Sequence, residues 1–457
     1  MAEKYVTVGA TAGGDGSLTA PWDGMNDITW GTSVDDGDVL TMDGAFTVLG
    51  STTGIRSIGQ TYVDWVTVQG GSLIQAETPA YSFNVQWQDN DYLRLQDMAI
   101  GSATARSVYI RATTANVAHI HLRGLSVDNS RATIAAGHAI WVLDENGYAV
   151  SNVTISYVDV TGTSSGSNSD GINAQVGTNL DISDCVLTGT EAEGIDISGG
   201  TAGVTVRRIK GINVGRSVVK LHAQKRALDG VELVSVASSS GNQNYSNYGL
   251  LVQDVEASTI AQCSIYNPGG GPLSALGLDT VNPGNSAFTG NLFHNNILVA
   301  DYASGVTRLQ STHASGPDAA LTVFEGAHTW THNCMWQSGA QTRLIHFDDD
   351  TGNHVTEANH STFVSSHAGE INSDPLFIDA ANNDLRLHGD SPCIGAGTKW
   401  WADGNVPIGE DGLRHYDIPE MGAYALRSGG KKYMRKAALP PARMLPAGYD
   451  ISKVRAA

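Results

Sequence analysis

An apolar position recurs along this chain of 457 residues at intervals close to 27 residues. Each occurrence lies in a short segment in which apolar and polar side chains alternate, as expected of a strand. The successive intervals are 27, 27, 33, 27, 24, 27, 27 and 28 residues. A period this regular predicts a solenoid, because each repeat then buries its apolar face against its two neighbours. The recurring positions are Val68, Leu95, Leu122, Ile155, Ile182, Val206, Leu233, Ile260 and Phe288.

A second strand-like triplet follows in most repeats, with apolar first and last residues that should point inward. No 3.6-residue periodicity or strand–helix alternation appears, and a β-sandwich does not explain a fixed period. We therefore predict an all-β fold, a right-handed parallel β-helix of at least nine coils of about 27 residues, spanning residues 1–426. Longer coils carry inserted loops, such as Thr161–Asn168 and Ser238–Tyr248. The triplets are Phe83–Val85, Val108–Ile110, Ile140–Val142, Ile172–Ala174, Ile195–Ile197, Val219–Leu221 and Leu250–Val252.

Charge divides the chain into an acidic body and a basic end. The net charge is −19, but residues 427–457 hold eight Lys and Arg and only Asp450, so they carry +7 and the rest carries −26. An acidic body argues against nucleic acid or an anionic membrane as a partner. The basic end contains Pro440, Pro441 and Pro446 and follows Gly429-Gly430, so we predict an extension that docks on another surface.

The chain shows no sign of membrane insertion or of a secretory signal. The segment that begins at Met1 lacks an apolar core of the needed length, and no run of 18 apolar residues occurs. The four cysteines, at positions 185, 263, 334 and 393, lack the close spacing of a zinc site or a disulfide framework. We expect an extracellular protein or a virion component.

The two ends of the predicted β-helix resemble those of the pectate-lyase-like superfamily. At the start, Tyr5-Val6-Thr7-Val8, Gly14-Asp15-Gly16-Ser17 and Pro21-Trp22 resemble the entry coil. At the end, Ser373-Asp374-Pro375-Leu376-Phe377, Ser391-Pro392-Cys393-Ile394-Gly395 and Pro419-Glu420-Met421-Gly422 resemble the closing segment. The resemblance implies the β-helix fold and a polysaccharide partner. It leaves the activity open, because the fold carries lyases, hydrolases, epimerases, adhesins and tailspikes.

Outward side chains of equivalent strands should stack into columns, with one residue on each coil. The second strand gives the column Asn84, Tyr109, Trp141, Asn173, Asp196, Lys220 and Leu251. The next outward position gives Gln86, Arg111, Leu143, Gln175, Ser198, His222 and Gln253, and the strand is entered through Arg106, His138, Asp170, Glu193, Ser217 and Tyr248. Rings, amides and carboxylates in one groove suit a glycan. We predict substrate binding by Tyr109, Arg111, Trp141, Asn173 and Arg216.

Two reactions fit this groove. In the first, Asp170, Glu193 or Asp196 act as the acid and base of a glycoside hydrolase. The run Asn168-Ser169-Asp170 followed by Glu193 resembles the carboxylate rungs of polygalacturonases. The paired aspartates and the Gly-His-Gly rung of that family are replaced here by Ala192-Glu193 and Gly215-Arg216-Ser217.

The second reaction is β-elimination on a uronic acid. The groove resembles that of related lyases, which implies Lys220 as base, His222 or Arg216 as helper, and Ca²⁺ held by Asp170, Glu193 and Asp196. Lys220 and Asp196 are neighbours in one column and should form a cross-strand ion pair, which stabilises the charged amine and opposes its use as a base.

Three settings fit the sequence. Resemblance to tailspikes implies a phage tailspike or virion appendage that is homotrimeric and assembles through residues 427–457. The alternatives are a free secreted Ca²⁺-dependent polysaccharide lyase or glycoside hydrolase, and a non-catalytic structural or adhesin protein of a virion.

Overall fold

A computed structural model of the chain describes most of the predicted β-helix and none of the predicted basic extension, whose role stays a prediction. Phe288 and the inner parts of the two predicted inserted loops also lie outside the described residues. The described residues are 2–48, 54–75, 83–101, 106–130, 137–163, 169–199, 203–223, 228–239, 248–267, 274–280, 289–300, 307–311, 328–337, 345–347, 354–355, 368–400, 408–409 and 420–424.

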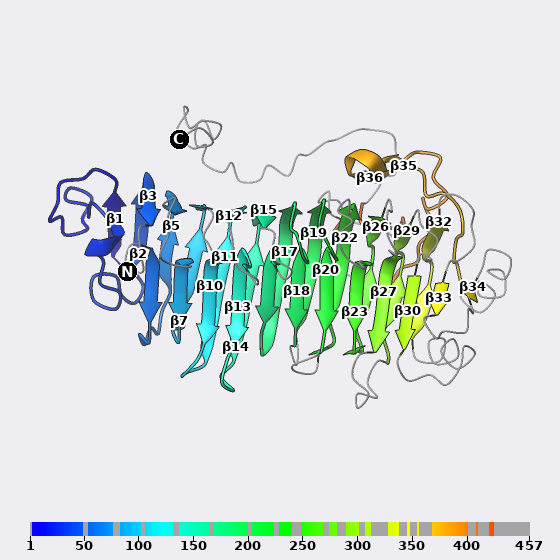
Figure 1. The fold of residues 1–457 in the computed structure, drawn as a ribbon, viewed down its shortest axis with the longest axis horizontal. Coiled ribbons are helices and arrows are strands. Elements are labelled where there is room, and N and C mark those ends of the chain that lie inside the picture. Colours follow the sequence, from blue (N-terminus) through cyan, green and yellow to red (C-terminus); the bar gives the residue numbers. More distant parts are fainter. Residues whose placement is uncertain are drawn as a thin grey trace.

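One strand of each coil belongs to a sheet of 12 strands within the described residues. Its strands pair in parallel with the strands one coil before and after, except for β34, which is antiparallel to β33. Figure 1 shows them as a row of arrows along the long axis of the molecule. They are β4 (Ile55–Ile58), β7 (Phe83–Gln88), β10 (Arg106–Ala112), β13 (Ile140–Asp144), β16 (Ile172–Gln175), β18 (Ile195–Ser198), β20 (Val219–His222), β23 (Tyr248–Gln253), β27 (Ser274–Thr280), β30 (Thr307–Ser311), β33 (Ile345–Phe347) and β34 (His354–Val355).

The other strands of each coil form a second parallel sheet, with 20 strands in the described part. Its first strands are β1 (Glu3–Thr7), β2 (Val39–Asp43), β5 (Val66–Gln69), β8 (Leu93–Gln96), β11 (Val117–Arg123), β14 (Val150–Ser156), β25 (Thr259–Ala261), β28 (Leu292–His294) and β31 (Thr329–Thr331). Its second strands are β3 (Ala45–Val48), β6 (Ser72–Gln75), β9 (Ala99–Ile100), β12 (Ser126–Asn129), β15 (Asp159–Thr163), β26 (Ser264–Asn267), β29 (Ile297–Ala300) and β32 (Cys334–Gln337). Both positions are spanned by β17 (Thr178–Thr188), β19 (Val204–Ile212) and β22 (Glu232–Ser239). The predicted parallel β-helix is confirmed.

The corner between these first and second strands is a bend with a left-handed backbone residue. It lies two residues after the recurring apolar position and has a positive φ on coil after coil, for example 53° at Asp97 and 54° at Tyr157. Non-glycine residues adopt this conformation at an energetic cost, so the tertiary structure enforces it. The residues at the corner are Gly70, Asp97, Gly124, Tyr157, Asp184, Arg208, Ser235, Gln262, Asn295 and His332.

The recurring apolar residues form the core, and eight of the nine predicted positions are correct. Each residue from Val68 to Leu233 is paired with the predicted residue of the next coil, and all eight positions up to Ile260 are at most 2% exposed. The ninth is wrong, because Ile260 pairs with Phe293 and not with Phe288. That coil is 33 residues long, and both phenylalanines satisfy a purely apolar criterion.

The closing segment folds back along the second sheet (Figure 1, orange). It begins with the antiparallel pair β35 (Phe377–Asp379) and β36 (Asp384–Leu387), joined by the 3-10 turn η2 (Ala380–Asn382). Leu385 packs with Ala237 and Tyr424 over the strands, which covers apolar surface of the later coils. All four cysteines are free and buried.

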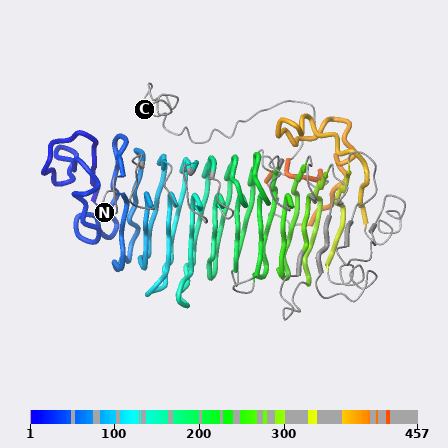
Figure 2. Tube along the Cα trace, viewed as in Figure 1, coloured from blue at the N-terminus to red at the C-terminus, as the bar shows by residue number. Residues whose placement is uncertain are grey.

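At the other end, the entry coil contains the 3-10 turn η1 (Met25–Asp27). One further short pair is formed by β21 (Leu228–Asp229) and β24 (Val255–Glu256). Along the chain, each of these two strands follows a strand of the 12-stranded sheet and precedes a strand of the 20-stranded sheet. Figure 2 shows the same path as a continuous coil from the N-terminus to the closing segment. None of the described helices is long and apolar enough to cross a membrane.

Candidate active site

The predicted outward column is present on the 12-stranded sheet. Tyr109, Trp141, Asn173, Asp196, Lys220 and Leu251 are paired in this order on β10, β13, β16, β18, β20 and β23. The first predicted member is wrong, because Gln86 and not Asn84 pairs with Tyr109. A shift of two residues keeps every side chain on the same face, so alternation cannot detect it.

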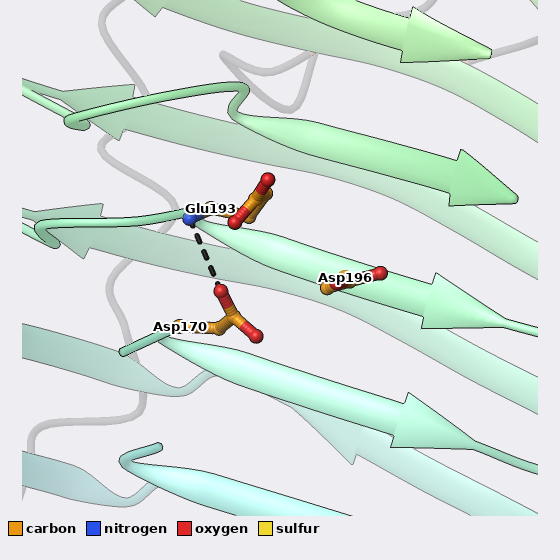
Figure 3. A group of neighbouring side chains, drawn as sticks. All are labelled: Asp170, Glu193 and Asp196. Atoms are coloured by element: carbon orange, nitrogen blue, oxygen red, sulfur yellow. Dashed lines mark hydrogen bonds between the residues drawn. The ribbon is translucent and has the colours of Figure 1, made fainter. Parts of the chain in front are cut away.

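Three carboxylates converge beside this column, one from the column itself and two from the residues that enter the strands (Figure 3). Asp170 precedes β16, Glu193 precedes β18, and Asp196 lies within β18; one carboxylate oxygen from each lies within 4.8 Å of the others. The backbone N–H of Glu193 donates to Asp170 Oδ1 at 3.2 Å. All three residues are buried, between 2% and 8% exposed. Like charges at this distance in a poorly solvated site repel strongly, so the three cannot all be ionised without compensation.

Glycines allow the two carboxylates before the strands to stack this closely. A Cβ atom on Gly171 would lie 2.6 Å from the carbonyl oxygen of Gly194, and one on Gly194 would lie 2.6 Å from that of Val218. Real Cβ atoms do not approach carbonyl oxygens so closely, because they would overlap. The Asp-Gly and Glu-Gly pairs therefore belong to the local architecture that places Asp170 and Glu193 on neighbouring coils.

Asp170 is stabilised as a carboxylate. Burial alone would raise its pKa, but the hydrogen bond and charge of His138, together with the Asn173 amide, lower the pKa to about 2. His138 Nδ1 lies 3.1 Å from Asp170 Oδ2, and Asn173 Nδ2 donates to the same oxygen at 2.8 Å. The Asp170 backbone N–H also lies 3.2 Å from His138 Nδ1 and could donate to it. A proton on Nδ1 that is donated to the Asp170 carboxylate makes the stronger hydrogen bond, because that bond is charge-assisted.

Glu193 is stabilised in its protonated form. Burial and then the charge of Asp170 raise the pKa of Glu193 to about 8. Two basic groups are near, with Arg216 Nη1 3.5 Å from Glu193 Oε2 and Lys220 Nζ 3.9 Å from Oε1. Both contacts are longer than a charge-assisted hydrogen bond, so they do not offset the loss of solvation. Neighbouring Asp170 and Glu193 thus have pKa values on opposite sides of neutral pH.

Asp196 binds the remaining predicted residues. His222 Nε2 lies 2.8 Å from Asp196 Oδ1, and Lys220 Nζ lies 3.6 Å from Oδ2. The predicted cross-strand pair of Asp196 and Lys220 is therefore present. The predicted catalytic residues Asp170, Glu193, Asp196, Lys220 and His222 form one cluster, together with Asn173 and Arg216.

The oxygen atoms of this cluster suit a hard divalent cation. Three carboxylates offer oxygen ligands from two neighbouring coils, which is the donor type that Ca²⁺ prefers. Asn173 Oδ1 is buried and has no hydrogen-bond partner among the described residues, and its amide is already fixed by Asp170. An orphaned amide oxygen beside three carboxylates is a fourth hard donor. The residues therefore fit the predicted calcium site.

The predicted aromatic binding residues lie on the coils before the carboxylates. Phe83, Tyr109 and Trp141 stack, with ring centroids 4.9 and 5.1 Å apart. Tyr109 is only 3% exposed and both its ring faces are covered by neighbouring rings, so the Tyr109 ring does not offer a face for a sugar to stack on. Arg111 is held by Gln88 Oε1 at 2.7 Å. Substrate binding by these residues stays a prediction.

Two residues of this site were not predicted as functional. His138 contacts Asp170, and the Arg106 guanidinium lies over the Trp141 ring at 3.8 Å from its centroid. Both belong to the predicted entry column that also contains Asp170 and Glu193. Their position in that column could have indicated a role in the site, because an Arg or a His taken alone does not indicate function.

Comparison with known proteins shows the class of fold. No protein-family model matches the chain, and no curated protein matches its sequence. Among solved structures, the chain is similar to the crystal structure of pectate lyase Pel9A, with a TM-score of 0.52 and 14% identity. The alignment covers 93% of this chain and 96% of the other. The likeness therefore extends over the whole β-helix, and at this identity it shows the fold.

Proposed function

We propose that the chain is a cation-assisted polysaccharide lyase that cleaves a uronic-acid polymer on the sheet face around Asp170, Glu193 and Asp196. One observation carries the proposal: three buried carboxylates converge within 4.8 Å, and the Lys220 amine lies at their edge. A lyase needs a positive charge against the substrate carboxylate and a base beside it. The lyase-like fold is consistent with this role.

Lys220 is the proposed base. Its neutral amine takes the proton from the carbon next to the substrate carboxylate, and the electrons of that C–H bond form a carbon–carbon double bond. The glycosidic C–O bond on the neighbouring carbon breaks, the leaving oxygen takes a proton from water, and Lys220 releases its proton to solvent. A divalent cation held by the three carboxylates would neutralise the substrate carboxylate and favour the neutral amine of Lys220.

The neighbours of the base position the cluster. His222 fixes Asp196 through a 2.8 Å contact, and His138 fixes Asp170 through a 3.1 Å contact. Arg216 Nη1 lies 3.5 Å from Glu193 Oε2. When Glu193 binds the cation, Arg216 would bind a carboxylate of the acidic substrate. Trp141 lies on the coil before Asn173 and would extend the substrate-binding face in that direction.

The test is a panel of polygalacturonate, alginate and a neutral glucan, assayed for unsaturated products with added Ca²⁺ and with chelator. We expect unsaturated products from at least one uronate polymer, none from the glucan, and loss of activity in chelator that added Ca²⁺ restores. Glu232→Ala, an exposed change on the other sheet, is the matched control and should leave the activity unchanged. Absence of unsaturated products from both uronate polymers would overturn the proposal.

A glycoside hydrolase is the second candidate, favoured by the split pKa values. A protonated Glu193 beside an ionised Asp170 is the pairing that acid–base glycosidases use. In that case the panel yields new reducing ends without unsaturated products. The activity then survives chelation and is lost in Glu193→Gln.

We also propose a setting in which the chain is part of an oligomeric virion appendage, such as a tailspike. The basic extension 427–457 supports this, because +7 charges beside an acidic body favour docking on another surface. Light scattering of the full chain and of a chain ending at residue 426 tests it. A trimer that becomes monomeric on truncation supports the appendage, whereas a full-length monomer favours a free extracellular lyase. A trimer that neither binds nor cleaves any glycan favours a structural or adhesin role.

A further inference from the structure

A groove lies on the 20-stranded sheet, over the first strands β11, β14, β17 and β19. It is an open cleft of about 470 Å³ lined by residues of five coils, from Trp65 at one end to Thr205 at the other. Its volume is in the range of ligand-binding clefts. None of its lining residues belongs to the carboxylate cluster, which is built on β16 and β18 of the 12-stranded sheet.

The floor of this groove is a row of hydrogen-bonding side chains at the coil spacing. His121, Thr154, Asp181 and Thr205 are paired in order on four successive coils. They span roughly 14 Å at about 4.8 Å per coil. The row offers an imidazole, two hydroxyls and a carboxylate to whatever lies along the axis. A ligand with a repeating pattern of hydroxyl groups matches such a row.

An amide ladder forms one border of the groove. Asn179 Nδ2 donates to Asn152 Oδ1 at 2.8 Å, and both residues have a left-handed backbone, with φ of 56° and 52°. His119 occupies the equivalent place on the preceding coil with φ of 61°. Asparagine and histidine both tolerate this conformation, which recurs at Tyr92 and Gly203 on the flanking coils.

Aromatic side chains close one end of the groove. Trp65 is partly exposed, and the Arg94 guanidinium lies 4.5 Å from the centroid of its ring. His119 stacks on Tyr92 with ring centroids 4.5 Å apart, and its ring lies 6.4 Å from that of Trp65. An indole of this kind presents an electron-rich face to the C–H groups of a sugar ring.

The groove is nearly neutral. Asp181 is its only charged lining residue in the described part, and Arg207 Nη2 donates to Asp181 Oδ2 at 2.7 Å. Burial, Arg94 and Arg123 lower the pKa of His121, so its imidazole is neutral near pH 7.

We infer that this groove is a second, non-catalytic glycan-binding site that holds an uncharged stretch of polysaccharide along the axis of the β-helix. A nucleic acid would need several Lys or Arg side chains against its phosphates, and the described lining has no Lys or Arg. A protein interface would need an apolar centre, whereas this floor is polar. The inference stands independently of the proposed lyase reaction, because the two sites share no residue.

The test is affinity electrophoresis of the full chain in gels that contain galactan, mannan or polygalacturonate. We expect retention by at least one of the two neutral polymers. Retention should persist in about 1 M salt, where the Debye length is about 3 Å and ionic contacts are screened. Trp65→Ala and the double variant Asn152→Gly/Asn179→Gly should each weaken retention by about tenfold or more. The glycine changes suit the left-handed backbone, so they remove the amides without backbone strain.

Matched controls separate this site from the candidate active site and from misfolding. Glu232→Ala, whose residue follows Thr205 in the same column outside the groove, should bind like the wild type. Lys220→Ala should also bind like the wild type, and Trp65→Phe should restore most of the retention. The inference is overturned if no neutral polymer retains the chain, or if the groove variants bind like Glu232→Ala. It is also overturned if Trp65→Ala alters only the oligomeric state, because the groove would then be a subunit interface.

Discussion

Replacement of Glu193 by glutamine should stabilise the protein at alkaline pH. In the folded chain, burial and the Asp170 charge raise the pKa of Glu193 from 4.5 to about 8. Below pH 4.5 the group is protonated in both the folded and the unfolded chain, so its contribution to stability is fully present. As the pH rises toward 8, the unfolded chain ionises first, and that contribution is lost. Glutamine copies the protonated carboxyl and does not titrate.

The magnitude follows from the pKa. A rise from 4.5 to about 8 sets a ceiling of about 5 kcal/mol on the pH-dependent loss of unfolding free energy. Relaxation of the cluster reduces this figure, and we expect Glu193→Gln to exceed the wild type by about 2 kcal/mol above pH 8. Near pH 4.5 the two proteins should be about equally stable.

Denaturant unfolding followed by tryptophan fluorescence, in chelator, measures this difference across the pH range. Glu232→Gln is the control, because its carboxyl is exposed on the other sheet and should not change the pH profile. Added Ca²⁺ should stabilise the wild type at alkaline pH and Glu193→Gln much less. Parallel pH profiles for the wild type and Glu193→Gln would refute the electrostatic reasoning about the cluster.

Three further predictions concern stability and assembly. Asp89 accepts hydrogen bonds from the backbone N–H groups of Thr113 and Thr114 at 2.6 and 2.9 Å, and although burial opposes it, these bonds lower the Asp89 pKa. Asp89→Ala should therefore lower the free energy of unfolding, measured with denaturant at neutral pH, by about 3 kcal/mol. The difference from the wild type should shrink as the pH falls below 3.8, because the Asp89 carboxylate then becomes protonated in the unfolded chain. Glu370→Ala should remove the buried acceptor of the Trp330 indole N–H and the Asn333 backbone N–H. The loss should lower the free energy of unfolding by about 2–4 kcal/mol and speed hydrogen exchange in β31 and β32, and unchanged exchange there would contradict the prediction. Removal of the basic extension should lower the oligomeric state in light scattering, and an unchanged mass would contradict the proposed docking role.

The fold could be predicted from the sequence because one inward apolar residue per coil is enough to show the period. The two errors have distinct physical causes. The prediction placed Asn84 in the column where the structure has Gln86, which is a register error of two residues. Such an error leaves the inward and outward faces of the strand unchanged, so alternation does not reveal it. The prediction of Phe288 instead of Phe293 assumed a constant coil length. Inserted residues lengthen this coil, so the equivalent position lies further along the chain.

The candidate site was predicted in its composition and not in its electrostatics. Asp196 and Lys220 belong to one predicted column, and Asp170 and Glu193 belong to the neighbouring column of residues that enter the strands. Because residues at equivalent positions stack, the two columns placed these four side chains together. The opposite pKa values of Asp170 and Glu193 depend on burial and on the contact with His138, which no spacing shows.

The floor of the groove on the 20-stranded sheet could have been predicted by the same reasoning. The row from His121 to Thr205 consists of the residues that directly precede the recurring apolar positions. Its concavity depends on how neighbouring coils are offset, which the sequence does not state.

The most direct test of the central claim is the rate of unsaturated product release by wild type and Lys220→Ala, on the uronate polymer that the wild type cleaves, with Ca²⁺ present. A general base contributes about 10²–10⁴-fold, so Lys220→Ala should lose at least about 100-fold in rate while its unfolding midpoint changes little. A Lys220→Ala variant that forms unsaturated product at the wild-type rate would contradict the assignment of Lys220 as the base.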